Sequence, residues 1–239
     1  MINVREQQDL LLDLARKLKK KIIVYVVGGT AMMFNGLKDA TKDIDIVFTS
    51  EEDRKEFKRS AIELGYNIID SVRIYGAKPN QPQMLSRGEE RFDLFVKEVI
   101  HFIFSKEMMK RAATTYEFDV NLILKIADPH DLILMKCATD RVKDKDDVRE
   151  IIKKYKIDWD IIINEALNQI KLGKNRAVWD LGTFVDDLIK LKVNMPADVP
   201  ERLWKLLKNK SMINIIKKLK TNNIQNPRLI AFSNINNMI

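Results

Sequence analysis

The chain has 239 residues, of which 46% are hydrophobic and 32% are charged, and its formal net charge is +8. This length allows one large domain or two small ones, each with a buried core. No apolar run approaches the roughly 20 residues that a transmembrane helix needs, and the first ten residues lack the layout of a signal peptide. Cys137 is the only cysteine, which excludes an intrachain disulfide and favours a cytoplasmic protein without a membrane span.

The first half of the chain is predicted to mix helices and strands. Amphipathic spacing predicts helices, β-branched runs predict strands, and Gly and Pro mark the turns. In chain order we expect a helix over 3–20, strands over 22–27 and 43–48, a helix over 50–64, a strand over 66–75, a loop over 76–83, a strand over 91–97, a helix over 106–113 and a strand over 119–126. This order indicates an α/β domain over about residues 1–127.

The second half is predicted to be helical throughout. Asp128 and Pro129 form a strong helix start, with Asp at the N-cap and Pro at the first helical position. Further helices are expected up to Tyr155 and over 158–172, 175–192, 200–209 and 211–220. The last 19 residues have no clear periodicity and are interpreted as a partly disordered tail or a docking arm. We therefore expect a helical domain over 128–239, with a cleft between it and the first domain.

The most informative stretch is Val26–Phe48, which reads VVGGTAMMFNGLKDATKDIDIVF. Gly28 and Gly29 allow backbone N–H groups to approach a phosphate closely, and the start of a following helix favours negative charge. Asp43 and Asp45 share one face of a strand, because alternate side chains point the same way. A cation would relieve their repulsion, and paired carboxylates suit Mg²⁺. The alternative is a glycine turn followed by a strand with two solvent-facing aspartates.

The residues Gly28-Gly29-Thr30, a short spacer and Thr41-Lys42-Asp43-Ile44-Asp45 resemble the signature of the DNA polymerase beta-like nucleotidyltransferase superfamily. The pattern is most similar to the minimal nucleotidyltransferases, which include the abortive-infection toxins of type IV toxin–antitoxin systems and their archaeal relatives. Many of these proteins carry Arg just before the Ala-Thr pair, where this chain has Asp39. The resemblance implies an α/β fold with the mixed sheet and flanking helices of a nucleotidyltransferase, followed by a C-terminal helical domain.

The resemblance also implies a metal site with catalytic carboxylates. Asp43 and Asp45 would hold two Mg²⁺ or Mn²⁺ ions, and a third carboxylate would come from a later strand. Asp93, within the predicted strand 91–97, lies where that residue is expected. An acidic residue between Phe92 and Leu94 is a poor choice for a core. The alternative for Asp93 is an edge-strand aspartate that faces water.

Gly28, Gly29, Thr30 and Lys136 are the candidate residues for binding a nucleoside triphosphate. Lys136 lies in an apolar helix, so it must either bind an anion or extend to the helix rim. In the abortive-infection relatives, a lysine in a comparable helix is associated with the nucleotide phosphates. Residues 141–147 resemble an R-x-K-D-x-x-D stretch of those proteins, and the alternative for them is a solvated turn between helices.

The net positive charge is concentrated at the C-terminal end. Residues 200–239 contain eight basic residues and one acidic residue, Glu201, and so supply nearly all of the excess. A basic end on a protein of phosphate chemistry suggests a polyanionic acceptor such as RNA. The alternative is a lysine-rich helix surface that only maintains solubility.

Three functions are consistent with these patterns. The first is transfer of a nucleoside monophosphate to a hydroxyl of RNA, such as a tRNA 3′ end, by a toxin with an antitoxin partner. The second is the same chemistry on a protein or on a small molecule such as an antibiotic, and the third is a non-catalytic nucleic-acid-binding module. The three aspartates argue against the third, because exposed carboxylates weaken the binding of polyanions. The basic end favours the first over the second.

Overall fold

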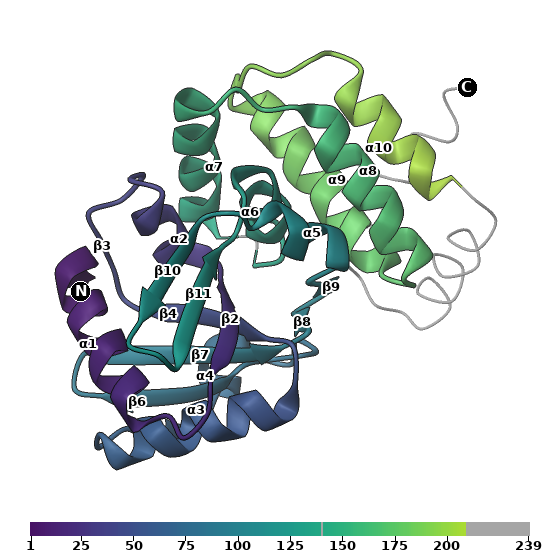
Figure 1. Cartoon of the computed structure of the whole chain (residues 1–239). Helices are drawn as coiled ribbons and strands as arrows, with labels where there is room; N and C mark the ends of the chain where they lie inside the picture. The colour runs from purple at the N-terminus through teal and green to yellow at the C-terminus, as the bar shows by residue number, and fades with distance from the viewer. Residues whose placement is uncertain (140, 209–239) are drawn as a thin grey trace.

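The computed structural model describes residues 1–139 and 141–208, in which helices and strands are mixed up to Ile126 and the rest is helical. The strands are β1 (Ile2–Asn3), β2 (Ile22–Val26), β3 (Ala40–Thr41), β4 (Ile44–Phe48), β5 (Asn67–Ile69), β6 (Gln83–Arg87), β7 (Glu90–Val96), β8 (Glu98–Val99), β9 (Phe102–Ile103), β10 (Thr115–Phe118) and β11 (Leu122–Ile126). The helices are α1 (Val4–Lys17), α2 (Gly28–Phe34), α3 (Glu51–Glu63), α4 (Val72–Tyr75), α5 (Lys106–Arg111), α6 (Pro129–Lys136), α7 (Val142–Lys154), α8 (Trp159–Lys171), α9 (Asn175–Lys190) and α10 (Val199–Leu207). The predicted fold class, a mixed sheet with flanking helices and a helical C-terminal part, is confirmed (Figure 1).

The central sheet has the strand order β10-β11-β2-β4-β7-β6-β5, and β8 joins it through β7. Two neighbouring pairs along this order are parallel, β11 with β2 and β4 with β7, and the other pairs are antiparallel. The register of β4 and β7 places Asp45 directly beside Asp93. Pairing of strands that are far apart in the chain thus brings two of the predicted site residues together.

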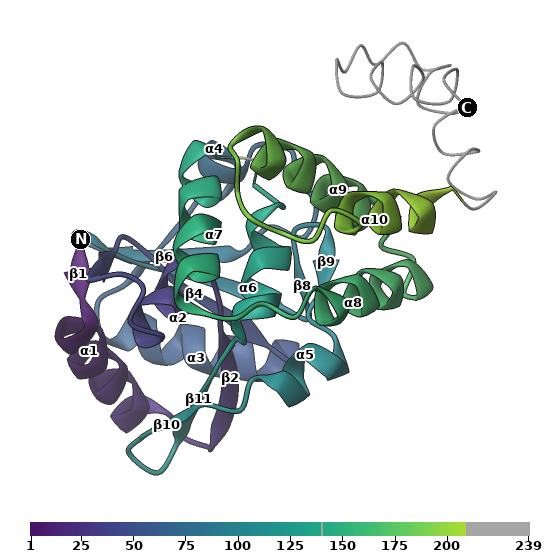
Figure 2. The ribbon, with the colours of Figure 1, turned by 90° about the horizontal axis from the view of Figure 1, so that it is seen from above.

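Helices lie on both sides of this sheet. Helix α3 packs across β4 and β7, and α1 packs against α3. Figures 1 and 2 show α8, α9 and α10 packed together on the side of the molecule away from α1. Helix α2 contacts both β4 and α6, so the helix that follows the two glycines connects the sheet to the C-terminal helices. Helix α6 contacts α2 of the first half of the chain as well as α7 and α8 of the second half. The domain boundary near residue 127 therefore stays a prediction.

Helix α7 is tied to the turn that follows α2. The ammonium group of Lys154 donates hydrogen bonds to the carbonyl oxygens of Asn35 and Gly36, both at 2.9 Å. The hydroxyl group of Tyr155 donates to the same Asn35 carbonyl at 3.1 Å, and Lys38 forms an ion pair with Asp147 of α7. The first and second halves of the chain are therefore connected by polar contacts as well as by packing.

Local signals in the sequence account for several helix starts. Asn3 and Glu6 form a reciprocal capping box at the start of α1. Ser50 accepts a hydrogen bond from the Asp53 N–H group at the start of α3, as its position in the sequence predicts. Asp128 likewise accepts from the His130 N–H group at the start of α6.

Two expectations from the sequence are wrong. The strand predicted over 66–75 is only β5, because the Asp70 carboxylate accepts a hydrogen bond from the Val72 N–H group at 2.9 Å and turns the chain into α4. The strand predicted over 119–126 begins at Leu122, because the preceding residues turn the chain back from β10, which the sequence analysis did not find. The helix predicted over 211–220 and the tail after it lie outside the described residues.

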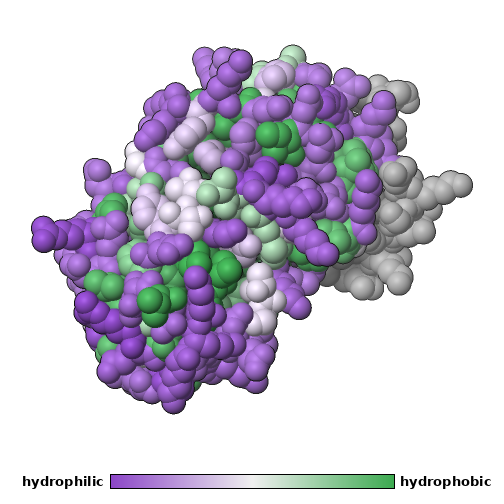
Figure 3. Space-filling view, in the orientation of Figure 1, coloured by the Kyte–Doolittle hydropathy of each residue, from purple (hydrophilic) through white to green (hydrophobic). Residues whose placement is uncertain are grey.

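The visible face of the molecule is mostly hydrophilic, with separate hydrophobic patches (Figure 3). Exposed large hydrophobic residues occur at scattered positions, and single residues of this kind are normal on protein surfaces. Within the part of the chain that the structure describes, no helix combines the length and the hydrophobicity needed to cross a bilayer.

Phe92 is expected to contribute strongly to stability. Its side chain is fully buried, and its ring centroid lies 5.3 Å from that of Phe57 and 5.1 Å from that of Tyr66. Truncating a buried Phe to Ala costs about 3–5 kcal/mol, so Phe92→Ala should lower the free energy of unfolding in urea by that amount. Ile68→Ala, at a residue that is 62% exposed, should change it by less than about 0.5 kcal/mol. Equal losses in the two variants would contradict this packing.

Candidate active site

The two glycines bring the start of α2 directly against the strand that carries the aspartates. A Cβ atom at Gly28 would lie 2.1 Å from Oδ2 of Asp45, and one at Gly29 would lie 2.4 Å from Oγ1 of Thr41. Gly28 also has a φ of +60°, which other residues rarely adopt. The diglycine is therefore required by close approach at both positions and by backbone conformation at the first.

Asp43, Asp45 and Asp93 converge on one place at the sheet. Each offers a carboxylate oxygen, and these oxygens all lie within 4.8 Å of one another. Asp93 is fully buried, whereas Asp43 and Asp45 are half-buried. Strand β7 lies between β4 and β6, so the alternative of an edge-strand aspartate facing water is wrong for Asp93. Alternation along one strand predicts that Asp43 and Asp45 share a face, and the resemblance implies Asp93. The pairing of β4 with β7 is what brings Asp93 to them.

Two further residues contact this trio of carboxylates. The guanidinium group of Arg91 forms ion pairs with Asp43 and Asp93, the latter at 2.9 Å. The hydroxyl group of Tyr75 donates a hydrogen bond to Oδ2 of Asp93 at 2.6 Å. The sequence analysis named neither residue. Arg91 lies two positions before Asp93 on one strand, so the same alternation could have identified it, whereas Tyr75 was assigned to a strand that does not form.

Lost hydration and neighbouring carboxylates raise the pKa values of Asp45, Asp93 and Tyr75. Desolvation, followed by the charges of Asp43 and Asp93, raises the pKa of Asp45 to about 8. Burial also raises the pKa of Asp93, against the opposing effects of Arg91 and Tyr75. Desolvation and the neighbouring carboxylates raise the pKa of Tyr75, which keeps its hydroxyl group protonated.

The donor set fits a hard divalent cation. Three carboxylates provide the oxygen ligands that Mg²⁺ prefers, and Arg91 compensates only part of their charge. Among the described residues, the side chain of Asp45 has no hydrogen-bonding or ion-pair partner, although its two neighbours in the trio do. A cation among these oxygens would lower their pKa values and satisfy Asp45.

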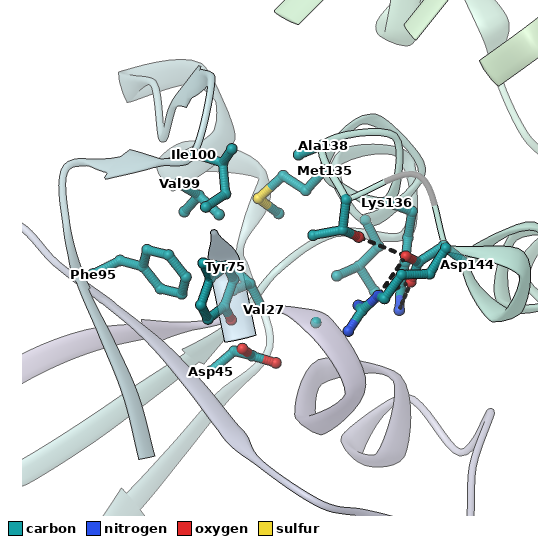
Figure 4. A pocket seen from close by; sticks show the side chains of 14 residues that line it. Val27, Asp45, Tyr75, Phe95, Val99, Ile100, Met135, Lys136, Ala138 and Asp144 are labelled. Atoms are coloured by element: carbon teal, nitrogen blue, oxygen red, sulfur yellow. Dashed lines mark hydrogen bonds and ion pairs between the residues drawn. The ribbon is translucent and has the colours of Figure 1, made fainter. Parts of the chain in front are cut away.

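A pocket with about 490 Å³ of space, part of it open to solvent, lies beside Asp45. One side of it is apolar, and the other side is polar and charged, as Figure 4 shows. Phe95, Val99 and Ile100 lie on the apolar side, and Lys136 and Asp144 lie on the opposite side. The lining also includes Leu132, Met135, Thr139 and Arg141. A ligand with an apolar ring system and an anionic group matches these two surfaces.

Lys136 lines this pocket but is held in buried ion pairs. Its ammonium group lies 3.2 Å from Oδ1 of Asp144 and also pairs with Asp147, and the residue is only 6% exposed. Against the effect of burial, Arg141 and Lys136 lower the pKa of Asp144 to about 2. Asp144 and Asp147 are buried. The alternative of a lysine at the helix rim is therefore wrong. The stretch over 141–147 is not a turn, because it belongs to α7 from Val142 onwards, although Val142, Lys143 and Asp146 are exposed.

Thr30 is fully buried and acts within the protein framework. Its hydroxyl group donates a hydrogen bond to the backbone carbonyl of Asp43 at 2.9 Å, and the side-chain amide of Gln7 donates to Thr30 Oγ1 at 3.5 Å. Thr30 thus fixes the first turn of α2 against the start of β4. A direct contact of its hydroxyl with a phosphate stays a prediction.

No family model matches this chain, and no curated protein is significantly similar to it in sequence. Among solved structures, the crystal structure of ANT(2″)-Ia in complex with adenylyl-2″-tobramycin is similar to 76% of this chain and 98% of that chain. The sequence identity is 13% and the TM-score is 0.39. Both values are too low to transfer a function, so we base the proposals on the site itself.

The close approach at Gly29 predicts that a second substitution restores part of the stability that the first one removes. Gly29→Ala should destabilise the protein, because its methyl group would collide with the Thr41 side chain. Thr41→Ala removes the nearest atom, Oγ1, and leaves Cβ at 3.2 Å, so the double variant should recover part of the lost stability. Thermal unfolding of the two single variants, the double variant and the wild type measures this coupling. Strictly additive losses would contradict the contact.

The raised pKa of Asp45 predicts a dependence of stability on pH. Because it lies at about 8 in the folded state, against an ordinary value of 3.8, the folded state binds more protons between these values. The free energy of unfolding should therefore fall as the pH rises through this window. Asp45→Asn should reduce this pH-dependent decrease in the free energy of unfolding, which is measured by urea unfolding in EDTA at about pH 5 and about pH 8. Mg²⁺ should stabilise the wild type more at the higher pH. Equal slopes for variant and wild type would contradict the assignment.

Proposed function

We propose that this chain is a metal-dependent nucleotidyltransferase that transfers a nucleoside monophosphate from a nucleoside triphosphate to an acceptor hydroxyl group. The observation that supports the proposal most is the convergence of Asp43, Asp45 and Asp93. They adjoin a pocket that has one apolar and one charged side. The diglycine, which leaves no space for a side chain beside Asp45, adds a second feature of the sequence signature.

In this proposal the three carboxylates hold two Mg²⁺ or Mn²⁺ ions, which would supply electrostatic stabilisation of the attacking and leaving oxygens. Asp93 would also accept the proton of the acceptor hydroxyl group. The oxygen of that group attacks the α-phosphorus in line, and pyrophosphate leaves.

The pocket would hold the rest of the nucleotide. Lys136 and Arg141 both act on the pKa of Asp45, so their positive charge reaches the place where the triphosphate would lie. Both side chains are anchored by Asp144, which fixes their position before any ligand binds. The apolar side of the pocket would accept the base.

Two classes of acceptor are candidates. RNA is a candidate because of the basic C-terminal end, but most of that charge lies outside the described residues. Within them, Arg202 is paired with Asp160 and Asp198, while Lys205 and Lys208 are exposed. A small molecule is the other candidate, and the acceptor in the ANT(2″)-Ia complex, tobramycin, supplies a test compound. A toxin role and an antitoxin partner stay predictions from the sequence.

Asp45→Asn should abolish transfer while the protein stays folded, because the charge of Asp45 and not its shape would bind a cation. Removing a residue that only supports a metal ligand lowers metal affinity or activity about 10–100-fold. For Asp45, as a ligand itself, we expect activity to fall at least about 100-fold. The assay uses each of the four α-labelled triphosphates with Mg²⁺ and offers bulk tRNA or tobramycin as acceptor. Asp146→Asn, at a side chain that is 66% exposed, is the matched control and should retain activity. Transfer by Asp45→Asn at the wild-type rate would refute the assignment.

A further inference from the structure

We propose that Tyr75 is a site of self-modification, at which the chain attaches a nucleoside monophosphate to its own phenolic oxygen. The inference rests on the proposed function and extends it to an acceptor within the chain. The product would be a phosphodiester between the tyrosine side chain and the 5′ position of a nucleoside. Such an adduct would lie in the pocket and would compete with an external acceptor.

The position of the Tyr75 hydroxyl group is the first observation. It donates to Asp93 at 2.6 Å, which is the contact that an acceptor hydroxyl needs with its proton acceptor. Tyr75 also lines the pocket together with Gly28 and Asp45. In Figure 4 its hydroxyl group lies on the side of the ring that faces Asp45.

Tyr75 is distinguished from the other hydroxyl group of the pocket. Among the described lining residues, only Tyr75 and Thr139 carry a hydroxyl group. That of Thr139 donates to Asp144 on the opposite side of the pocket, away from the carboxylate trio. The hydroxyl group that already occupies the place of an acceptor is therefore that of Tyr75.

Tyr75 itself is half-buried, but the segment around it is exposed. Helix α4 has four residues, and its Val72 and Ile74 are 57% and 50% exposed. Gly76, which follows, has a φ of +62° and open space where a Cβ would stand. Lys78 donates to the backbone carbonyls of Ala138 and Thr139, at 3.1 and 3.3 Å, and so holds the loop after α4 across the pocket. Outward movement of α4 would accommodate an adduct on Tyr75 without disturbing the sheet.

The transfer step balances without any further reactant. The phenolic oxygen of Tyr75 attacks the α-phosphorus of the triphosphate, and an oxygen–phosphorus bond forms. The bond from the α-phosphorus to the oxygen that bridges to the β-phosphate breaks, and pyrophosphate leaves with that electron pair. The proton of the phenol passes to the Asp93 carboxylate and from there to solvent.

The test uses the full chain, purified and incubated with Mg²⁺ and each of the four triphosphates. Intact mass is measured before and after incubation, and peptide mapping locates any adduct. We expect a mass increase of one nucleoside monophosphate, located on Tyr75, and no adduct on Tyr75→Phe. Tyr66→Phe is the matched control, because Tyr66 also donates to a carboxylate, Glu90, at 2.6 Å. It should acquire the adduct at the wild-type level, since Glu90 is not part of the carboxylate trio.

The outcomes separate the inference from the function on which it rests. If the wild type labels tRNA or tobramycin but carries no adduct on Tyr75, self-modification is wrong and the proposed function stands. An adduct that persists in Tyr75→Phe also overturns the inference. If no triphosphate gives transfer, an adduct or release of pyrophosphate, the proposed function itself fails. If Tyr75 only positioned Asp93, peptide mapping would find no mass increase at Tyr75.

Discussion

The carboxylates of Asp43, Asp45 and Asp93 repel one another, because the fold holds them close together. The parallel pairing of β4 with β7 sets Asp45 beside Asp93, and the oxygens of the trio lie within 4.8 Å of one another. Arg91 offsets this repulsion for two members and leaves Asp45 without a partner among the described residues. The site thus retains negative charge that no described side chain compensates, and this charge is the physical basis of the proposed metal dependence.

The cationic residues near the trio are fixed by carboxylates of their own. Asp144 accepts from Lys136 and Arg141, and it is fully buried. A buried charge without a partner would destabilise the fold, so this pairing stabilises the buried Asp144 and Lys136. Of the two cations beside the pocket, Arg141 has a side chain that is 51% exposed. Their attraction for an anion is weakened by their partners, but their orientation needs no rearrangement when a ligand binds.

Much of the site follows from the sequence. Alternation places Asp43 and Asp45 on one face, the family resemblance implies Asp93, and the glycines mark the close approach. The partners of these residues do not follow. The buried pairing of Lys136 depends on contact between α6 and α7, which no local pattern encodes. Tyr75 is not predicted as a site residue, because the apolar run over 66–75 resembles a strand. One Asx turn at Asp70 is enough to convert its second half into a helix.

The contacts between α7 and the turn after α2 bear on how a substrate enters. Lys154 and Tyr155 bind that turn, and Lys38 just after it pairs with Asp147 of α7, so these contacts cross the junction of the two halves of the chain. A hinge that swung the helical half away from the sheet would have to break all of these contacts together. The loop after α4 is attached to Ala138 and Thr139 by Lys78, and to Ile100, which also lines the pocket, by Asn80. A local gate at α4 would leave the contacts of α7 intact, and the two halves would move as one body while the short α4 segment opens and closes.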